Sequence, residues 1–175
     1  MPEKLIREIP LIKRYSRHNE NEDWSFRAFL KGNTRLSVEK IDREVEALTE
    51  AIWKEIDCTT CANCCKTLQI VIDDHDIGRL SKHLEVSVAQ FTEKYVVREP
   101  DGVKLFKSSP CPLLGQDNKC TVYDVRPQAC RDFPFLHEKE FSSRSISMIE
   151  NCATCPIVFN VWNQLKFKVG FKRKK

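Results

Sequence analysis

The residues of this sequence that are suited to chemistry are nine cysteines, four of which lie within eight residues. Cys58, Cys61, Cys64 and Cys65 form overlapping C-x-x-C units followed by an adjacent pair. Closing such short loops around one metal costs little entropy, and a C-x-x-C turn lets two sulfurs approach the same ion. Adjacent cysteines direct their side chains differently, so Cys64 and Cys65 are also compatible with two separate metals. This segment is therefore interpreted as a thiolate metal site.

Five further cysteines follow this first cluster. They are Cys111, Cys120, Cys130, Cys152 and Cys155. The first three lie beside proline or turn-forming sequence, and the last two repeat the C-x-x-C spacing. Eight thiols would furnish two four-cysteine sites with one left over, and the sequence does not assign sulfurs to sites. All nine are candidate ligands, with a buried free thiol as the alternative for isolated Cys111.

The expected compartment decides between metal ligation and disulfide bonding. Residues 1–9 break their apolar residues with charges, unlike the continuous apolar stretch of a secretory signal. No segment approaches the ~18 uninterrupted apolar residues of a membrane span. We therefore expect a cytoplasmic protein without membrane contact, and in that reducing compartment dense cysteines indicate metal rather than disulfides.

The formal net charge of +4 counts every cysteine as a neutral thiol. Metal ligands are thiolates, so a zinc ion bound by four of them contributes a charge of −2, as does a four-iron cluster with a core charge of +2. Two such sites would cancel the +4. The apparent basicity is therefore weak support for a nucleic-acid partner, and we predict none.

The elements that must position the cysteines are predicted from hydrophobic periodicity. Residues 1–36 are interpreted as an N-terminal arm, because charges and scattered aromatics show no sustained period there. The cysteine-cluster domain is placed at residues 37–165 and a basic tail at 166–175. Ser37 suits a helix N-cap, and the apolar residues after it recur at steps of three and four up to Ile52, which predicts a helix.

Short elements are predicted after the first cluster. Alternation at residues 68–72 indicates a strand, and one-sided apolar residues at 76–84 indicate a helix. Ser87, with Gln90 three residues later, forms a capping-box pattern that predicts a second helix.

A second group of elements completes the fold prediction. A turn signal at 100–102 predicts that residues 103–106 return as a strand beside 96–97. Residues 108–134 are rich in proline, cysteine and turn formers, so we expect ligation to organise them, and the spacing within 157–165 predicts a helix. The predicted fold class is mainly α with minor β, as a small irregular metal-stapled single domain.

The cysteine pattern resembles that of a known family. It runs from Cys58-x-x-Cys61-x-x-Cys64-Cys65 through Cys111-Pro-Leu-Leu to Cys120-Thr-Val-Tyr123-Asp-Val-Arg126-Pro127-Gln-Ala-Cys130-Arg131-Asp-Phe133-Pro134. This is similar to the CxxCxxCC cysteine-cluster family, whose members are described as zinc- or iron-chelating. The resemblance covers roughly residues 55–155 and implies a metal-binding fold.

Two features limit what the resemblance implies. Family members often carry glycine between the second and third cysteines, where this chain has Ala62 and Asn63. Asn63 suits the left-handed conformation that such a turn requires. A related cluster also occurs in flagellin lysine methylases, but no S-adenosylmethionine motif is recognisable here, so that activity is not carried over.

The spacings favour an iron–sulfur cluster, such as a four-iron–four-sulfur (4Fe–4S) cluster, over Zn²⁺. Cys58, Cys61 and Cys64 have the C-x-x-C-x-x-C spacing of bacterial ferredoxins, and Cys155 before Pro156 matches their remote cysteine followed by proline. Zinc stays open, because Cys61 and Cys64 together with the C-x-x-C pair at residues 152–155 have the spacing of a zinc ribbon.

Other polar residues are assigned supporting roles. Arg126 and Arg131 are close enough in sequence to cysteines to donate hydrogen bonds to sulfur, with surface ion pairs as the alternative. Acidic residues before the helix at 76–84 are interpreted as caps and helix-dipole partners rather than ligands: Asp73, Asp74 and Asp76. Three histidines are expected to be exposed or in the core rather than to bind metal: His75, His83 and His137.

The function predicted from these observations is a metal-binding protein with one or two cysteine-ligated centres, most favourably iron–sulfur, acting in electron transfer or as an accessory protein to a protein partner. The first alternative is a structural-zinc interaction module, and the second is a metal-dependent enzyme. The C-x₃-C-x₂-C spacing of radical enzymes is absent, and no nucleophile and base pair stands out. Catalysis is therefore placed last, and the oligomeric state is left open.

Overall fold

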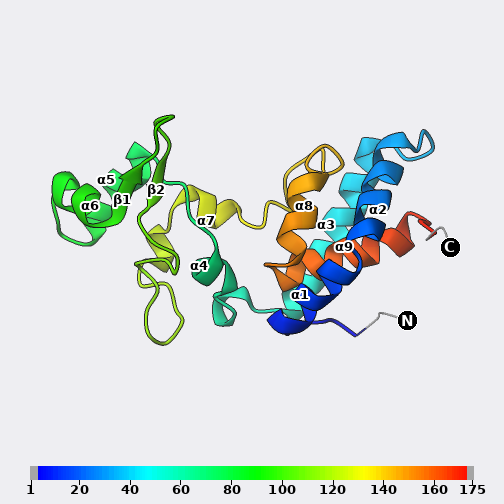
Figure 1. Ribbon diagram of the computed structural model, residues 1–175, viewed down its shortest axis with the longest axis horizontal. Helices are drawn as coiled ribbons and strands as arrows, with labels where there is room; N and C mark the ends of the chain where they lie inside the picture. The colour runs from blue at the N-terminus through cyan, green and yellow to red at the C-terminus, as the bar shows by residue number, and fades with distance from the viewer. Residues whose placement is uncertain (1–3, 173–175) are drawn as a thin grey trace. The chain divides into compact units, whose positions relative to one another are not determined.

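The computed structural model describes residues 4–172, and its contacts divide the chain into two compact units (Figure 1). The helical unit comprises the described residues up to Asp57 together with those from Pro134 onward, and the cysteine unit comprises Cys58–Phe133. Helices dominate, and the sheet of the described chain has two strands. The predicted class, mainly α with minor β structure, is confirmed. The predicted division at residues 36–37 and 165–166 stays a prediction.

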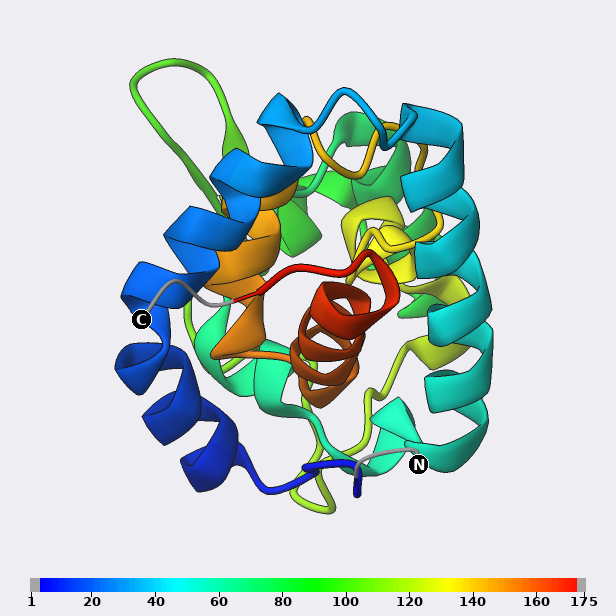
Figure 2. The same cartoon turned by 90° about the vertical axis from the view of Figure 1, so that its right-hand side faces the viewer.

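The helical unit is built from five helices in the described residues. These are α1 (Ile9–His18), α2 (Glu20–Gly32), α3 (Val38–Glu55), α8 (Ser145–Cys152) and α9 (Pro156–Lys168). Helix α9 contacts α1, α3 and α8, and Figure 2 shows it enclosed by the other helices of the unit. Its side chains are buried on nearly all sides, including Val158, Val161 and Trp162. The core of this unit therefore surrounds α9.

Helix α3 agrees with its sequence signal. The Ser37 side chain accepts a hydrogen bond from the Lys40 amide at 3.2 Å, which caps the helix as expected. The predicted apolar stripe contributes Ile41, Val45 and Ile52 to the core. The helix predicted within 157–165 is likewise confirmed as α9.

Helices α1 and α2 occupy the segment in which the sequence shows no sustained period. Their buried apolar side chains are few, namely Ile12, Phe26 and Leu30. The apolar face of α1 is only ten residues long and the helix ends at Asn19, so no single period runs through the segment. Local end signals are present instead: Pro10 lies in the first turn of α1, and the first turn of α2 is acidic.

A buried polar network joins α2 to α9. Asp23 Oδ1 accepts hydrogen bonds from Trp162 Nε1 at 2.8 Å and from Lys166 Nζ at 2.6 Å. Lys166 also donates to Glu22 Oε1 at 2.8 Å and to Asn163 Oδ1 at 3.2 Å, so its three donors are satisfied. Burial raises the pKa of Asp23, and the bond and charge of Lys166 oppose that shift. The buried charges are acceptable because they are paired and hydrogen-bonded.

The cysteine unit contains a compact apolar core. Its regular elements are η1 (Cys58–Thr60), α4 (Asn63–Thr67), α5 (Asp74–His83), α6 (Val88–Tyr95), β1 (Val96–Arg98), β2 (Lys104–Phe106), η2 (Tyr123–Val125) and α7 (Gln128–Asp132), where η marks a 3₁₀ turn. The core residues are Ile72, Ile77, Leu80, Phe91, Val96, Phe106, Leu113 and Val122. Leu113 and Val122 come from the irregular segment that carries Cys111 and Cys120, so this core supports the cysteine loops directly.

Several local predictions in this unit are confirmed. Asp73 caps α5 by accepting from the Asp76 amide at 2.7 Å. Ser87 and Gln90 form both hydrogen bonds of the capping box at the start of α6. Strands β1 and β2 pair antiparallel, with Val96 opposite Phe106.

The strand predicted at 68–72 is reduced to a single bridge. Val71 pairs with Leu105, and two main-chain bonds flank the bridge: Ile72 N to Lys104 O at 2.9 Å, and Phe106 N to Ile70 O at 3.0 Å. The segment therefore follows the free edge of β2. It is too short to continue, because Asp73 already caps the next helix.

The helices of the described residues include none long and apolar enough to cross a membrane.

We predict that the buried network of α2 and α9 stabilises the helical unit strongly. Asp23→Ala would leave the Lys166 ammonium buried without its closest carboxylate, which is expected to lower the free energy of unfolding by about 3–5 kcal/mol. The control is Glu55→Ala, which breaks an exposed pair with Arg7 and should cost less than about 1 kcal/mol. Urea denaturation followed by circular dichroism measures both, and equal stabilities for the two variants would refute the prediction.

Candidate metal centre

The first cysteine segment is a pair of short turns. Cys58 lies in η1, and the Cys61 amide donates to the Cys58 carbonyl at 3.2 Å. Ala62 then adopts a left-handed conformation with φ of 50°, and α4 follows immediately. Sequence reasoning placed that conformation at Asn63, which is wrong: Asn63 is the first residue of α4 and is buried. The change of backbone direction at Ala62 therefore falls between Cys61 and Cys64.

A main-chain bond joins the two cysteine segments. The Cys111 amide donates to the Cys65 carbonyl at 2.7 Å, although 45 residues separate them in the sequence. This bond holds the backbone of one candidate ligand against the backbone of another. Cys65 and Cys111 therefore belong to one local site.

Cys120 is returned toward Cys111 by a tight loop. The Gly115 amide donates to the Lys119 carbonyl at 2.8 Å, and the Thr121 amide donates to the Leu113 carbonyl at 3.0 Å. A Cβ at Gly115 would lie 2.7 Å from Asp117 Oδ1 and 3.2 Å from the Lys119 carbonyl oxygen. Only glycine fits such a close approach without a shift of the loop.

Four half-buried thiols in this unit affect one another's ionisation. They belong to Cys65, Cys111, Cys120 and Cys130, called the four-thiol site below. Burial, with a smaller contribution from the charges of neighbouring cysteines, raises the pKa of Cys111 to about 11 and that of Cys130 to about 12. Burial and the charge of Cys65 also raise the pKa of Cys120. Without a cation these three groups stay neutral thiols, and metal binding has to displace their protons.

Cys65 differs from the other three thiols. A hydrogen bond with Cys64, whose sulfur lies 3.9 Å away, lowers the pKa of Cys65 to about 7, although burial opposes the shift. The Cys65 amide and the charge of Lys66 act in the same direction as Cys64. Cys65 is therefore the thiol of the site most ready to act as a thiolate ligand near neutral pH.

The two arginines of the motif have different surroundings. Arg126 lowers the pKa of Cys120 and Cys130, against the larger effect of burial. Its guanidinium carbon lies 4.0 Å from the ring centre of Tyr123, which fixes the side chain by a cation–π contact. Arg131 donates to the main chain, to the Arg126 carbonyl at 3.1 Å and the Asp124 carbonyl at 2.5 Å. Arg126 thus acts on the thiols electrostatically, whereas Arg131 holds the loop.

The last two cysteines belong to the helical unit. Cys152 is 1% exposed in α8, and burial raises its pKa well above the ordinary value, with the charge of Asp23 adding to the effect. Cys155 is buried at the N-cap position of α9, and Pro156 is the first residue of that helix. The Cys-Pro sequence is therefore explained by a helix start, where proline is favoured, without any appeal to a cluster.

The described residues contain one three-residue group whose potential ligand atoms all lie within 4.8 Å, and it is not made of cysteines. It consists of Asp73, His75 and Asp76. Asp73 caps α5, and Asp76 forms an ion pair with Arg79. The interpretation as a helix cap is confirmed for Asp73, whereas Asp76 is occupied by its ion pair.

Three histidines of the chain are expected to be exposed or in the core. His75, His83 and His137 are all exposed. The expected exposure of these histidines is confirmed, and the absence of metal binding at them stays a prediction.

The sulfur donor set of the four-thiol site fits both zinc and an iron–sulfur cluster. Soft thiolates suit zinc and iron–sulfur clusters, and four cysteines match the ligand number of both. The fold and the four-thiol site therefore define a small, mainly helical protein with a cysteine-rich metal-binding unit.

The chain belongs to the CxxCxxCC family. The family profile, described as "Putative zinc- or iron-chelating domain", matches residues 57–156. The match includes the whole cysteine unit and extends to the C-x-x-C pair of the helical unit. No solved structure matches the chain.

The left-handed residue between the second and third cysteines gives a stability prediction. The left-handed conformation costs a residue with a side chain roughly 1–2 kcal/mol in the folded state, whereas glycine adopts it freely. Glycine also has more entropy in the unfolded chain, which destabilises the folded state by about 0.5–1 kcal/mol. Ala62→Gly is therefore expected to raise the free energy of unfolding by up to about 1 kcal/mol. Ala51→Gly, in the interior of α3, is the matched control and should lower it by about 1 kcal/mol. Chemical denaturation of both variants measures the two changes in the free energy of unfolding, which should have opposite signs. A decrease for Ala62→Gly as large as that for Ala51→Gly would contradict the prediction.

Proposed function

We propose that the four-thiol site holds an iron–sulfur cluster and that the protein transfers electrons or assists another enzyme. The observation that carries the proposal is the grouping of four half-buried thiols that affect one another's ionisation, in a unit whose apolar core packs against two of them. They are Cys65, Cys111, Cys120 and Cys130. Membership of a family described as zinc- or iron-chelating supports metal binding at such a site.

The number of thiols in the cysteine unit supports iron–sulfur over zinc. The four-thiol site itself contains no C-x-x-C pair, so its spacing favours neither metal. Three further thiols, Cys58, Cys61 and Cys64, precede Cys65 with ferredoxin-type spacing. Seven thiols in one unit exceed the four that a single zinc ion takes, and they would provide ligands for a second centre.

The protein's own residues would tune such a centre. A bound cluster supplies one-electron redox chemistry, with a potential set by charge, hydrogen bonds to sulfur and solvent exposure. The positive charge of Arg126 near Cys120 and Cys130 would stabilise the reduced, more negative form of the cluster and so raise its reduction potential. Cys58 is exposed, which places the start of the cluster motif at the surface, where a protein partner has access. We expect that partner to be an electron donor or acceptor in the cytoplasm.

A structural-zinc interaction module is the second candidate. The observation that favours it is that the ligand-bearing segments contain only short helical turns and an isolated bridge between Leu114 and Cys120 among their described residues. Because such segments have little regular structure of their own, metal binding would supply much of the free energy that folds them. A zinc protein would be colourless and would unfold on chelation.

Metal analysis of the full chain distinguishes the two candidates. We predict iron matched by acid-labile sulfide, with visible absorbance, in protein purified without oxygen. Stoichiometric zinc without sulfide would overturn the iron–sulfur proposal and favour the structural module.

Variants of single cysteines test which thiols hold the metal. Cys130→Ser is expected to lose the metal of the four-thiol site, because serine is a poor ligand for either metal. Cys152→Ala is the matched control: it changes a cysteine buried in the helical unit and should keep the wild-type metal content. Full metal content in Cys130→Ser would refute the assigned ligand set.

The first cluster is tested separately, because its thiols have the spacing for a centre of their own. Cys61→Ser is expected to remove metal from one centre and to destabilise the cysteine unit. Unchanged metal content, measured beside Cys130→Ser, would show that Cys61 is not a ligand.

A further inference from the structure

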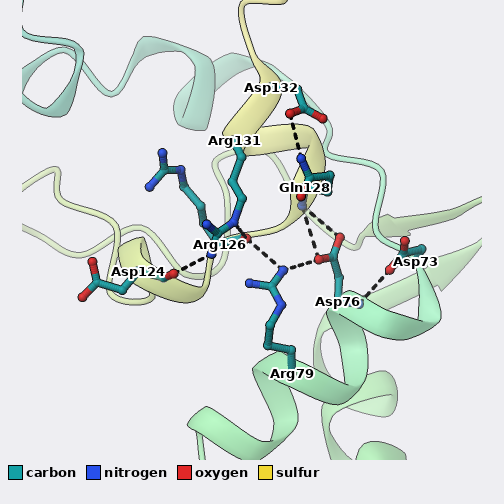
Figure 3. Close-up of polar contacts among 8 residues, drawn as sticks. All are labelled: Asp73, Asp76, Arg79, Asp124, Arg126, Gln128, Arg131 and Asp132. Atoms are coloured by element: carbon teal, nitrogen blue, oxygen red, sulfur yellow. Dashed lines mark hydrogen bonds and ion pairs between the residues drawn. The ribbon is translucent and has the colours of Figure 1, made fainter.

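Helix α7, which carries Cys130, takes its N-terminal cap from another helix. Its own N-cap residue is Pro127, and no side chain there caps the helix. The first amide, Gln128 N, instead donates to the carboxylate of Asp76 on α5, at 3.1 Å to Oδ2 and 3.3 Å to Oδ1 (Figure 3). An unsatisfied helix amide is thus capped by a residue 52 positions earlier in the chain.

Arg79 extends this contact to the residue before the helix. Its Nη2 donates both to Asp76 Oδ1 and, at 3.0 Å, to the main-chain carbonyl of Arg126. The same carbonyl accepts a second bond from Arg131 Nε at 3.1 Å. Figure 3 shows Arg79 between Asp76 and the Arg126 segment. One turn of α5 therefore fixes the backbone on both sides of Pro127.

The fixed segment lies between two of the proposed ligands. It joins Cys120 to Cys130, and Cys130 is only two residues beyond Gln128. The Asp76 side chain is 3% exposed, so its bonds to Arg79 and Gln128 have little competition from water. Asp76 and Arg79 thus link the start of α7, two residues before Cys130, to α5.

We propose that Asp76 is a positioning residue of the metal centre: through Gln128 and Arg79 it holds α7 so that Cys130 presents its sulfur to the metal. The inference rests on the proposed function of the four-thiol site. It assigns Asp76 no role as a ligand, because both carboxylate oxygens are occupied by N–H donors. Groups that orient metal ligands commonly contribute 10–100-fold to metal affinity.

The test is a Co²⁺ titration of the full-length chain without oxygen, with thiolate-to-cobalt absorption as the signal. Asp76→Asn keeps the size of the side chain but loses the charge and turns an NH₂ group toward N–H donors. It is expected to weaken Co²⁺ binding at least tenfold and to reduce the charge-transfer intensity per cobalt, because fewer thiolates reach the ion.

A matched control separates positioning from charge. Asp132→Asn removes a carboxylate charge two residues from Cys130, but Asp132 accepts its bond from Gln128 Nε2 on the same helix and does not link α7 to α5. Its Co²⁺ affinity should stay within twofold of wild type. Equal weakening in the Asp76 and Asp132 variants would overturn the inference in favour of a general charge effect.

A second variant keeps the inference testable if Asp76→Asn fails to fold. Arg79→Gln changes a partly exposed side chain and removes the bridge to the Arg126 carbonyl, so it should weaken Co²⁺ binding in the same direction. Wild-type affinity and spectrum in a folded Asp76→Asn or Arg79→Gln protein would refute positioning while leaving the metal site intact. Wild-type binding in Cys130→Ser would instead refute the proposed site itself.

Discussion

The cysteine unit depends on one electrostatic constraint: thiols that are half-buried and close together cannot all ionise unless a cation is among them. Burial and mutual repulsion hold Cys111, Cys120 and Cys130 in their neutral forms, whereas the bond from Cys64 prepares Cys65 as a thiolate. Binding a cation displaces the thiol protons and offsets part of the repulsion among the four thiolates. The arrangement is thus poor as a set of free thiols and well suited to a metal.

Much of the regular structure could be predicted because its signals are local. Ser37 with its apolar stripe, the Ser87 and Gln90 capping box, and the turn between β1 and β2 each lie within a few residues of the element they define. Helices α1 and α2 escaped prediction because each is short and the break at Asn19 interrupts the period, while the α8 and α9 helices that they contact are remote in the sequence. The strand predicted at 68–72 was too long. Alternation of apolar residues indicates which side chains are buried, but it does not show that the N-cap of α5 at Asp73 ends the strand pairing.

The candidate site could be predicted in its composition but not in its connections. All nine cysteines were recognised, yet only the structure separates those of the cysteine unit from Cys152 and Cys155. The left-handed residue is Ala62 and not Asn63, because the start of α4 takes Asn63 into helical geometry. The role of Asp76 had no sequence signal beyond an acid near a helix start, since its partner Gln128 is remote. The connections of the site depend on contacts between segments that are distant in the sequence, and no short stretch of sequence contains both partners.

The chain leaves the helical unit at Asp57 and re-enters it at Pro134, so the cysteine unit is an insertion within another folded body. Contact between α3 and α9 therefore closes a loop that contains the entire insertion. The entropy of closing a loop grows with the length of flexible chain inside it, and a folded insertion behaves as a much shorter connection than an unfolded one. Order in the insertion thus favours assembly of the surrounding helices through chain connectivity alone. If the cysteine unit lost its metal and unfolded, the flexible loop between α3 and α9 would become longer, and closing it would cost the helical unit more entropy.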